Sequence, residues 1–341
     1  MRPAVRALVV DDSPSMRAAI NHILSADPEI EVVGMAPEPH SARKMIRELN
    51  PDVVTLDIEM PGMDGLSFLE RIMRLRPMPV VMCSTLTARG AEATIEALRL
   101  GAVDCVQKPS GSAADIVQNG ARLRETVKSA ARSALRRDHG AVEPPQRSLG
   151  SDQRDVVIAI GASTGGVEAL FTLLGALPSD APPVLVVQHM PGAFTPGFAA
   201  RLERECAIRV VEARDAMPLE RGTVYIAPGG ERHMELAGGT SGRIRLRGGE
   251  AVGGHRPSVD VLFRSMAALG QSAIGVILTG MGSDGAAGLL AMRKAGATTL
   301  GQSEASCVVY GMPRAAFELG AVERELGLGS IPAAILRACK K

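Results

Sequence analysis

Short apolar runs alternate with segments of helical periodicity along most of the chain, and this alternation constrains the fold more than any other feature. Five such runs, among them Val53–Asp57 and Val80–Ser84, fall in the first third of the sequence. A second series follows, with runs at 155–160, 184–187 and 274–278. Strands that are apolar throughout are buried on both faces, and helices join them into parallel sheets. We therefore expect an α/β fold made of two doubly wound parallel-sheet domains.

The length of the chain and one irregular segment indicate where these domains lie. A sequence of 341 residues favours two domains over one. Apolar periodicity is lost over 138–153, where two adjacent prolines stand among polar residues, and this is typical of a linker. We expect a first domain at 1–125, a helical and flexible linker at 126–153, and a second domain at 154–341.

The charge balance excludes one broad class of function. Lysine and arginine total 38 and aspartate and glutamate 37, which argues against a mainly nucleic-acid-binding protein. Aromatic residues make up only 2%, so base stacking on aromatic side chains is not expected either. Residues 111–137 have the pattern of one long basic helix, and we interpret its charge as a solvated face rather than a nucleic-acid patch.

Cysteine usage and apolar run lengths indicate the compartment. The five cysteines form no close CxxC pair and most stand in apolar runs, which predicts buried, reduced thiols. No pattern of cysteine and histidine suggests a zinc site. The N-terminal apolar run is too short for a signal peptide, and no stretch reaches the roughly 18 apolar residues of a membrane helix. We expect a soluble, cytoplasmic protein.

Polar side chains stand at the ends of the strands expected in the first domain. Asp11 and Asp12 end the first strand, Asp57 ends the third, Ser84 ends the fourth, and Lys108 follows the fifth. Ligands and reacting groups of open parallel sheets lie beyond these carboxyl ends. Three carboxylates repel one another unless a cation joins them, and hard oxygen ligands of this kind suit Mg²⁺. A metal, a hydroxyl and an ammonium around one carboxylate would stabilise a transferring phosphoryl group.

Four motifs make this domain resemble the receiver domains of response regulators. They are DD near the start, DIEMPGMDG, MCST and KP, and the similarity covers residues 1 to about 125. The resemblance implies a flavodoxin-like fold in which Asp57 is the phospho-acceptor. It also implies that Asp11, Asp12 and Asp57 hold Mg²⁺ together with the backbone carbonyl of Glu59. The alternative is a flavodoxin-like sheet whose acids merely end strands, and the combination of five polar positions in register argues against it.

The same resemblance assigns two further roles around the phospho-acceptor. It implies that Ser84 reorients toward the phosphoryl group and that Lys108 pairs with it. It also implies a cis peptide bond between Lys108 and Pro109.

Three loops of the second domain, each following an expected strand, supply a serine, a histidine and an aspartate. Ser163 lies in GASTGG, His189 in QHMP and Asp284 in TGMGSDG. A serine hydroxyl becomes a useful nucleophile when an imidazole takes its proton and a carboxylate orients that imidazole. Taken singly, His189 is more typical of a structural residue and Asp284 of a helix N-cap. Because all three follow strands of one expected sheet, together they predict acyl-transfer chemistry.

The GASTGG segment supports two interpretations. It resembles the GxSxG nucleophile elbow, and it also resembles a glycine-rich phosphate loop. The phosphate interpretation is weakened because GxGxxG is not met and no acid lies at the expected distance. The order Ser–His–Asp also differs from the Ser–Asp–His of α/β-hydrolases, so a different fold is expected.

Six segments make the second domain resemble the catalytic domain of chemotaxis protein-glutamate methylesterases. They are IGASTGG, QHMP, YIAPGG, HRPSVDVLFRS, LTGMGSDGAAG and VVYGMPRAA, and they span about 155 to 335. The resemblance implies a Rossmann-like α/β domain in which Ser163 attacks the γ-carboxyl methyl ester of a receptor glutamate. His189 is implied as general base and then general acid, and Asp284 as the group that orients it. Thr164 and the backbone around Met281 are the implied polar surroundings of the oxyanion, and no cofactor is expected in this site.

Departures from the family pattern are small. Ser283 stands where the family often has Asn, and Tyr310 where Trp or Phe is common, and neither change removes a catalytic group. We interpret His233, Arg256 and Asp260 as structural or rim residues.

With its receiver in front, the whole chain is similar to this family, and the resemblance implies a function. We expect a phosphorylation-activated hydrolase that demethylates receptor glutamates, and deamidates receptor glutamines, for chemotactic adaptation. The implied partners are a chemotaxis histidine kinase and a methylated helical receptor region, without nucleic acid or membrane insertion. We expect the unphosphorylated receiver to limit access to Ser163. Two alternatives stay open: a phosphorylation-gated binding module with an inactive hydrolase domain, and a related esterase of a non-chemotaxis receptor pathway.

Overall fold

The structure is a computed structural model, and it divides into two compact units. Unit one spans Met1–Leu135 and unit two spans Arg136–Lys341. The structure describes residues 3–60, 64–85, 88–109, 113–133, 148, 150 and 153–340, without the side chains of 88–89 and 113–119. Of the linker predicted at 126–153, the structure describes residues 126–133, which include the end of the fifth helix, and residues 148, 150 and 153; the rest lies outside the described residues.

Unit one is a five-stranded parallel sheet in the order β2-β1-β3-β4-β5, the flavodoxin-like order. Its strands are β1 Val5–Val10, β2 Ile30–Ala36, β3 Val53–Asp57, β4 Val80–Ser84 and β5 Asp104–Gln107. Every residue of β3 and of β4 is buried, as expected for apolar strands covered on both faces.

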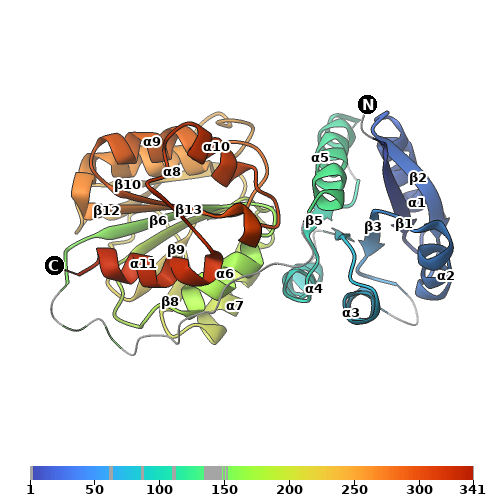
Figure 1. The fold of residues 1–341 in the computed structure, drawn as a ribbon, viewed down its shortest axis with the longest axis horizontal. Coiled ribbons are helices and arrows are strands. Elements are labelled where there is room, and N and C mark those ends of the chain that lie inside the picture. The colour runs from blue at the N-terminus through green and yellow to red at the C-terminus, as the bar shows by residue number, and fades with distance from the viewer. Residues whose placement is uncertain are drawn as a thin grey trace. The chain divides into compact units, whose positions relative to one another are not determined.

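Helices connect the strands of unit one and cover its sheet (Figure 1). They are α1 Pro14–Ser25, α2 Pro39–Leu49, α3 Gly65–Leu75, α4 Ala88–Arg99 and α5 Ala113–Ala131. α1 packs against α5, and α3 packs against α4. The Ser13 hydroxyl caps α1 by accepting a hydrogen bond from the Met16 N–H. The predicted basic helix ends earlier than expected, since the chain forms a turn and a bend at 132–133.

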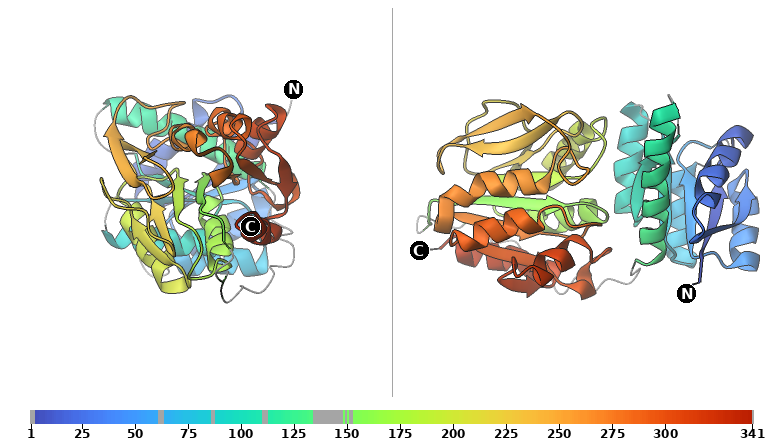
Figure 2. Two further views of the ribbon diagram at one scale, coloured as in Figure 1. Left: turned by 90° about the vertical axis from the view of Figure 1, so that its left-hand side faces the viewer. Right: turned by 90° about the horizontal axis from the view of Figure 1, so that it is seen from above.

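Unit two contains a seven-stranded sheet in the order β14-β13-β12-β6-β7-β9-β8, and all its pairings are parallel. A separate antiparallel hairpin, which the sequence interpretation did not anticipate, is formed by β10 and β11 (Figure 2, right). The strands of this unit are β6 Val157–Ala162, β7 Val184–Gln188, β8 Arg209–Glu212, β9 Thr223–Ile226, β10 Arg232–Ala237, β11 Arg243–Gly248, β12 Ala273–Ile277, β13 Thr298–Gln302 and β14 Arg324–Leu326.

Helices lie on both faces of the seven-stranded sheet, with α8, α9 and α10 on one face and α6, α7 and α11 on the other (Figure 1). Their bounds are α6 Gly166–Gly175, α7 Thr195–Glu205, α8 Val259–Met266, α9 Ala286–Lys294, α10 Met312–Glu318 and α11 Ile331–Ala338. Both units are thus doubly wound parallel-sheet domains, and the predicted fold class is confirmed. None of the helices in the described part combines the length and apolar composition that crossing a bilayer requires.

Two smaller expectations have different outcomes. All five cysteines are free, and four are buried while Cys206 is partly exposed, so the predicted reduced thiols are confirmed. The expected cis bond between Lys108 and Pro109 is wrong: in the described residues the cis peptide is Arg256–Pro257. A trans bond is the preferred state of most X–Pro peptides, and nothing in the residues of the KP pair themselves requires otherwise.

Candidate active site

In unit one, the predicted acidic cluster forms at the carboxyl end of the sheet. Asp11, Asp12 and Asp57 each offer a carboxylate oxygen, and these oxygens lie within 4.8 Å of one another. Asp11 and Asp57 are buried, whereas Asp12 is exposed. The Lys108 ammonium lies 2.9 Å from Oδ2 of Asp11 and 2.7 Å from Oδ2 of Asp57. The lysine therefore joins two of the three carboxylates, as their mutual repulsion requires.

Burial and the contact between them act in opposite directions on the pKa values of Asp57 and Lys108. Burial raises the pKa of Asp57, and the contact with Lys108 only partly offsets it. Burial by itself lowers the pKa of Lys108, but its hydrogen bonds to Asp57 and Asp11 outweigh burial and raise it above its usual value. Because burial disfavours the ionised form of this aspartate, a further cation nearby would stabilise it, and so would moving its negative charge onto a larger group.

Ser84 and Glu59, the other residues predicted for this site, have the following contacts. Ser84 is buried at the end of β4, and its hydroxyl donates to the carbonyl oxygen of Thr85 at 3.1 Å. The Lys108 N–H donates to the Ser84 carbonyl oxygen at 2.9 Å, so the two residues are neighbours. The Glu59 N–H donates to Oδ1 of Asp57 at 3.1 Å. Three carboxylates, two buried and one exposed, whose oxygens lie within 4.8 Å of one another are a donor set that fits Mg²⁺.

In unit two, the three predicted residues follow three adjacent strands. Ser163 follows β6, His189 follows β7, and the loop with Asp284 follows β12, and β6 lies between the other two strands. Because all three strands are parallel, their carboxyl ends meet at one edge of the sheet. Ala162 pairs with Gln188, so Ser163 and His189 are the next residues in register. The expectation that all three residues follow strands of one parallel sheet is confirmed.

The backbone of Ser163 is held from both sides. Its N–H donates to the Thr279 carbonyl at 3.0 Å, and its carbonyl accepts from the Gln188 side chain at 2.9 Å. Gly280 approaches it so closely that a Cβ there would lie 2.7 Å from the Ser163 Cβ. Real Cβ atoms essentially never come this near another carbon, so glycine is required at 280 for the serine to keep its place. Ser163 itself is half-exposed.

Asp284 is buried, and the start of α8 holds both of its oxygens. Oδ1 accepts from the Ser258 hydroxyl at 2.8 Å and from the Asp260 N–H at 3.0 Å. Oδ2 accepts from the Val259 N–H at 2.7 Å and lies 2.9 Å from Nε2 of His189. Burial by itself raises the pKa of Asp284, but these hydrogen bonds, with that of His189 the strongest, outweigh burial and hold the pKa below its usual range. Asp284 is therefore an anion at neutral pH.

This anion determines which ring nitrogen of His189 is basic. An ionised carboxylate only accepts hydrogen bonds, so Nε2 of His189 carries the proton that it shares with Asp284. Nδ1 is then the nitrogen with the lone pair, and it is buried without a hydrogen-bond partner among the described residues. An imidazole with one nitrogen bound to an anion and the other free is suited to accept a proton from a neighbouring hydroxyl.

The two positions expected around the oxyanion also lie at this edge. Thr164 is buried, and its carbonyl accepts from the Thr279 hydroxyl at 3.0 Å. Met281 is half-buried, directly after the glycine that touches Ser163, and its N–H donates no hydrogen bond within the described residues.

Sequence reasoning missed His255. Its ring stacks on that of His189, with ring centroids 3.8 Å apart and an angle of 4° between the planes. A tight turn presents it: Val252 and His255 exchange two backbone hydrogen bonds, and both central residues have positive φ, 60° at Gly253 and 82° at Gly254. Only glycine adopts two such conformations in succession without strain, so the GG pair before the histidine was the available signal.

Sequence reasoning also missed the hydrogen bond from the Ser258 hydroxyl to Asp284, although that serine lies in one of the segments used for the resemblance.

The three residues interpreted as structural or rim residues bind backbone groups. The His233 ring accepts from the Ser258 N–H at 3.2 Å, Arg256 donates to the carbonyls of Gly230 and Gly249, and Oδ1 of Asp260 accepts from the Gly288 N–H.

Comparisons with known proteins identify the family of the chain. Residues 158–335 match the family model for CheB methylesterase, and residues 7–119 match that for the response regulator receiver domain. A protein-glutamate methylesterase/protein-glutamine glutaminase 1 from Caulobacter vibrioides is 58% identical over 335 residues, 97% of each chain. A protein-glutamate methylesterase/protein-glutamine glutaminase from Rhizobium etli is 55% identical over 340 residues, which cover 99% of this chain and 97% of that relative.

A solved structure supports the assignment of unit two. The crystal structure of the Thermotoga maritima CheB methylesterase catalytic domain is 35% identical and superposes with a TM-score of 0.52. The aligned region covers 55% of this chain and 98% of the Thermotoga maritima chain. The chain therefore belongs to the CheB methylesterase family, with a response regulator receiver domain ahead of the methylesterase domain.

Proposed function

We propose that this chain is a phosphorylation-activated protein-glutamate methylesterase of a chemotaxis pathway. Its substrates would be methylated glutamates, and also glutamines, of chemoreceptors. The observation that carries the proposal is the placement of Ser163, His189 and Asp284 after three adjacent parallel strands, with an anionic Asp284 fixing a basic Nδ1 on His189. The close relatives named for both activities support it. The binding-module alternative has no support, because no member of this set is missing.

The reaction follows from the tautomer. Nδ1 of His189 takes the proton from Oγ of Ser163 as that oxygen attacks the γ-carbonyl carbon of the glutamyl methyl ester. The C–O bond to the methoxy group breaks, the methoxy oxygen takes the proton from Nδ1, and methanol leaves a γ-glutamyl ester on Ser163. Water then repeats the sequence: it gives a proton to Nδ1, attacks the acyl carbon, and releases glutamate and the serine hydroxyl. With glutamine the leaving group is ammonia.

Asp284 and the oxyanion surroundings lower the barrier of these steps. The carboxylate stabilises the imidazolium that forms on His189, and its four donors keep it from moving. The Met281 N–H and the polar groups at Thr164 are the proposed donors to the tetrahedral oxygen, and one such donor contributes a factor of about 100 to 1000 in rate.

We propose that Asp57 of the receiver is the phospho-acceptor. Asp11, Asp12 and Asp57 would hold Mg²⁺ with the carbonyl of Glu59, and the ion would neutralise charge on the transferring phosphoryl group. Lys108 already contacts Asp57 and would pair with the phosphoryl oxygens, and Ser84 would turn from the Thr85 carbonyl to donate to them. A chemotaxis histidine kinase is the proposed phosphodonor.

The proposed functional division of the chain is a receiver at 1–125, a linker at 126–153 and a methylesterase domain at 154–341. The esterase would have a low basal rate that rises on phosphorylation of Asp57. Comparing the fragment 154–341 with the unphosphorylated full chain tests whether the receiver restrains the esterase. A fragment no faster than the full chain would contradict restraint without touching the esterase assignment.

The decisive experiment measures methanol release from methylated receptor membranes. Wild type and Ser163→Ala are compared, each with and without a small phosphodonor such as acetyl phosphate. We expect release that needs Ser163 and rises with the phosphodonor. Release that persists in Ser163→Ala would contradict the assigned nucleophile, and no release from wild type would favour another substrate, such as the receptor of a different pathway.

A further inference from the structure

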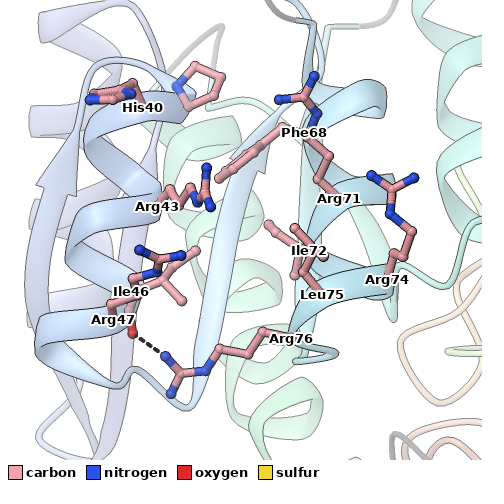
Figure 3. Close-up of a pocket in the computed structure, with 11 residues that line it drawn as sticks. His40, Arg43, Ile46, Arg47, Phe68, Arg71, Ile72, Arg74, Leu75 and Arg76 are labelled. Carbon is pink, nitrogen blue, oxygen red and sulfur yellow. Dashed lines mark hydrogen bonds between the residues drawn. The ribbon is translucent and has the colours of Figure 1, made fainter.

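A groove between α2 and α3 of unit one takes no part in the chemistry described above. It is a cavity of about 390 Å³ lined by both helices and by Arg76. Figure 3 shows Arg43 on α2 and Phe68 on α3 pointing toward one another across it. Arg76 reaches from the end of α3 and donates to the Ile46 carbonyl of α2 at 2.9 Å. This bond joins the two helices at their C-terminal ends.

The floor of the groove is apolar, and it continues onto the surface. Ile46, Phe68 and Ile72 are buried and form the floor. Phe68, Ile72 and Leu75 follow the i, i+4, i+7 spacing of one helical face, so they make a continuous strip along α3. Leu75, at the outer end of the strip, is 65% exposed. An apolar strip that runs from the core to an exposed leucine is typical of a surface that buries area against a partner.

The rim of the groove is basic. Arg43, Arg47 and Arg71 line it and are exposed, and none of them makes an ion pair within the part of the chain that the structure describes. Among the described residues, no aspartate or glutamate lines the groove. The opening therefore presents unneutralised positive charge around an apolar floor, and a complementary ligand must be acidic at its edges and apolar at its centre.

The arrangement favours a protein segment over a small anion or a membrane. Small-molecule sites place a few polar groups precisely inside an enclosed pocket, whereas here the polar groups are flexible arginines at the rim. An apolar centre with an arginine-rich rim is the usual composition of a protein interface. A bilayer surface would meet a convex or flat face more readily than a groove. Each helix has 11 residues and is about 16 Å long, which matches three turns of a helix lying between them.

We propose that the α2–α3 groove binds an acidic amphipathic helix of a partner protein. Its apolar residues, spaced i, i+3, i+4 and i+7, lie on Ile46, Ile72 and Leu75, and its flanking carboxylates pair with Arg43 and Arg71. Exposed ion pairs contribute little individually, so the apolar contact supplies most of the affinity and the arginines supply selectivity for acidic partners.

The test uses the full-length protein and a fluorescein-labelled peptide of about 12 residues, with leucines at that spacing and glutamates beside them. Binding is followed by fluorescence anisotropy at physiological salt. The double variant Arg43→Gln/Arg71→Gln is compared with Lys44→Gln/Arg122→Gln, which removes the same charge from exposed positions outside the groove. We expect the groove variant to weaken binding about tenfold and the control variant less than about twofold. Leu75→Ser should weaken it about fivefold.

Three probes distinguish other occupants. They are the same peptide with serine in place of leucine, inorganic pyrophosphate, and vesicles rich in phosphatidylglycerol. Binding of the leucine peptide that depends on Arg43, Arg71 and Leu75, with no comparable binding of the three probes, supports the proposal. Equal binding of the serine peptide or of pyrophosphate overturns it in favour of a simple anion site. Vesicle binding that the groove variant alone abolishes overturns it in favour of a lipid surface, and no peptide binding overturns it outright. Thermal unfolding of each variant checks that the receiver is folded, and none of these outcomes depends on esterase activity.

Discussion

The two units each place a buried aspartate at the carboxyl end of a parallel sheet, and the two carboxylates behave in opposite ways. Burial raises the pKa of Asp57 despite its contact with Lys108. The pKa of Asp284 is lowered although burial acts on it in the same direction, because its hydrogen bonds outweigh burial. Both residues are nearly inaccessible, at 1% and 6% exposure, so burial does not explain the difference.

The difference lies in the donors. Asp284 accepts from Ser258, Val259, Asp260 and His189, and three of these donors belong to the rigid start of α8. Asp57 has one backbone donor, that of Glu59 at 3.1 Å, and shares Lys108 with another carboxylate. Under the proposed roles, the carboxylate that only orients an imidazole has the larger set of fixed donors, and the one that reacts has the smaller set. The comparison teaches that the number of fixed donors, and not burial, accounts for the opposite pKa shifts of these two carboxylates.

The largest effect is expected from Asp284→Asn. The substitution replaces one carboxylate oxygen, a hydrogen-bond acceptor, with an amide NH₂ group, a donor. That group would face neighbours that are themselves donors. If the amide nitrogen meets Nε2 of His189, the ring proton moves to Nδ1 and the base is lost. We expect kcat for methanol release to fall about 10⁴-fold.

The matched variant is Asp57→Asn, which should leave the basal esterase rate within about twofold and abolish its rise with acetyl phosphate. A variant at Asp284 that keeps more than about a tenth of the wild-type rate, or one at Asp57 that is fully activated, would break the comparison.

A smaller effect is expected from Ser258→Ala, which removes one of the four donors to Asp284. The Ser258 hydroxyl donates to Asp284 at 2.8 Å and caps α8 by accepting from the Val261 N–H at 3.4 Å. We expect kcat to fall about tenfold, and the free energy of unfolding to fall by about 1 kcal/mol because the cap is lost. Steady-state kinetics and urea unfolding measure the two effects. Ser258→Thr keeps the hydroxyl and should restore most of both; if it does not, the donor count is not what matters.

Asp57→Asn should stabilise the receiver at neutral pH. The pKa of Asp57 is raised in the fold, so the folded state loses stability as pH rises from the unfolded value of 3.8 through the folded value. The variant has no carboxylate at position 57 and so does not lose this stability, and its Lys108 stays paired with Asp11. We therefore expect its free energy of unfolding to be about 1 to 2 kcal/mol higher than that of wild type at pH 7. Urea unfolding at pH 7 and near pH 4 checks it, because the gain should shrink at the lower pH. Mg²⁺ should stabilise wild type more than the variant. A variant less stable than wild type at pH 7 would mean that Lys108 already satisfies Asp57.

The sequence predicted the parts of this site that depend on local features of the chain, and it did not predict the contacts between residues far apart in the chain. Strand ends are local features, so the positions of Asp57, Ser163 and His189 followed from apolar runs and the residues directly after them. The meeting of β6, β7 and β12 at one edge followed from the general rule for parallel sheets. The groups around Asp284 were not predicted, because Ser258 is 26 residues away and its contact depends on how α8 packs against the sheet.

The hairpin β10–β11 and the turn that carries His255 were missed for a related reason. A hairpin on the periphery has weaker apolar periodicity than a strand buried on both faces, and β11 is largely exposed. The pKa directions were beyond the sequence as well, since they depend on hydrogen-bond donors that only the folded chain assembles.

The smallest expected effect concerns His255. It extends the comparison of Asp57 and Asp284 to the basic residues that contact them, Lys108 and His189. The Lys108 ammonium has no ring plane to keep, whereas His189 has one, and the ring of His255 stacks on it with ring centroids 3.8 Å apart. Aromatic stacking of this kind contributes about 0.5 to 1.5 kcal/mol, so His255→Ala should lower kcat roughly two- to tenfold with KM unchanged. His255→Phe keeps an aromatic ring over His189 and should recover most of the rate. Gly254→Ala, which strains the turn at a φ of 82°, should imitate His255→Ala. Steady-state methanol release measures all three, and a phenylalanine variant as slow as the alanine variant would show that the ring plane is set by Asp284 alone.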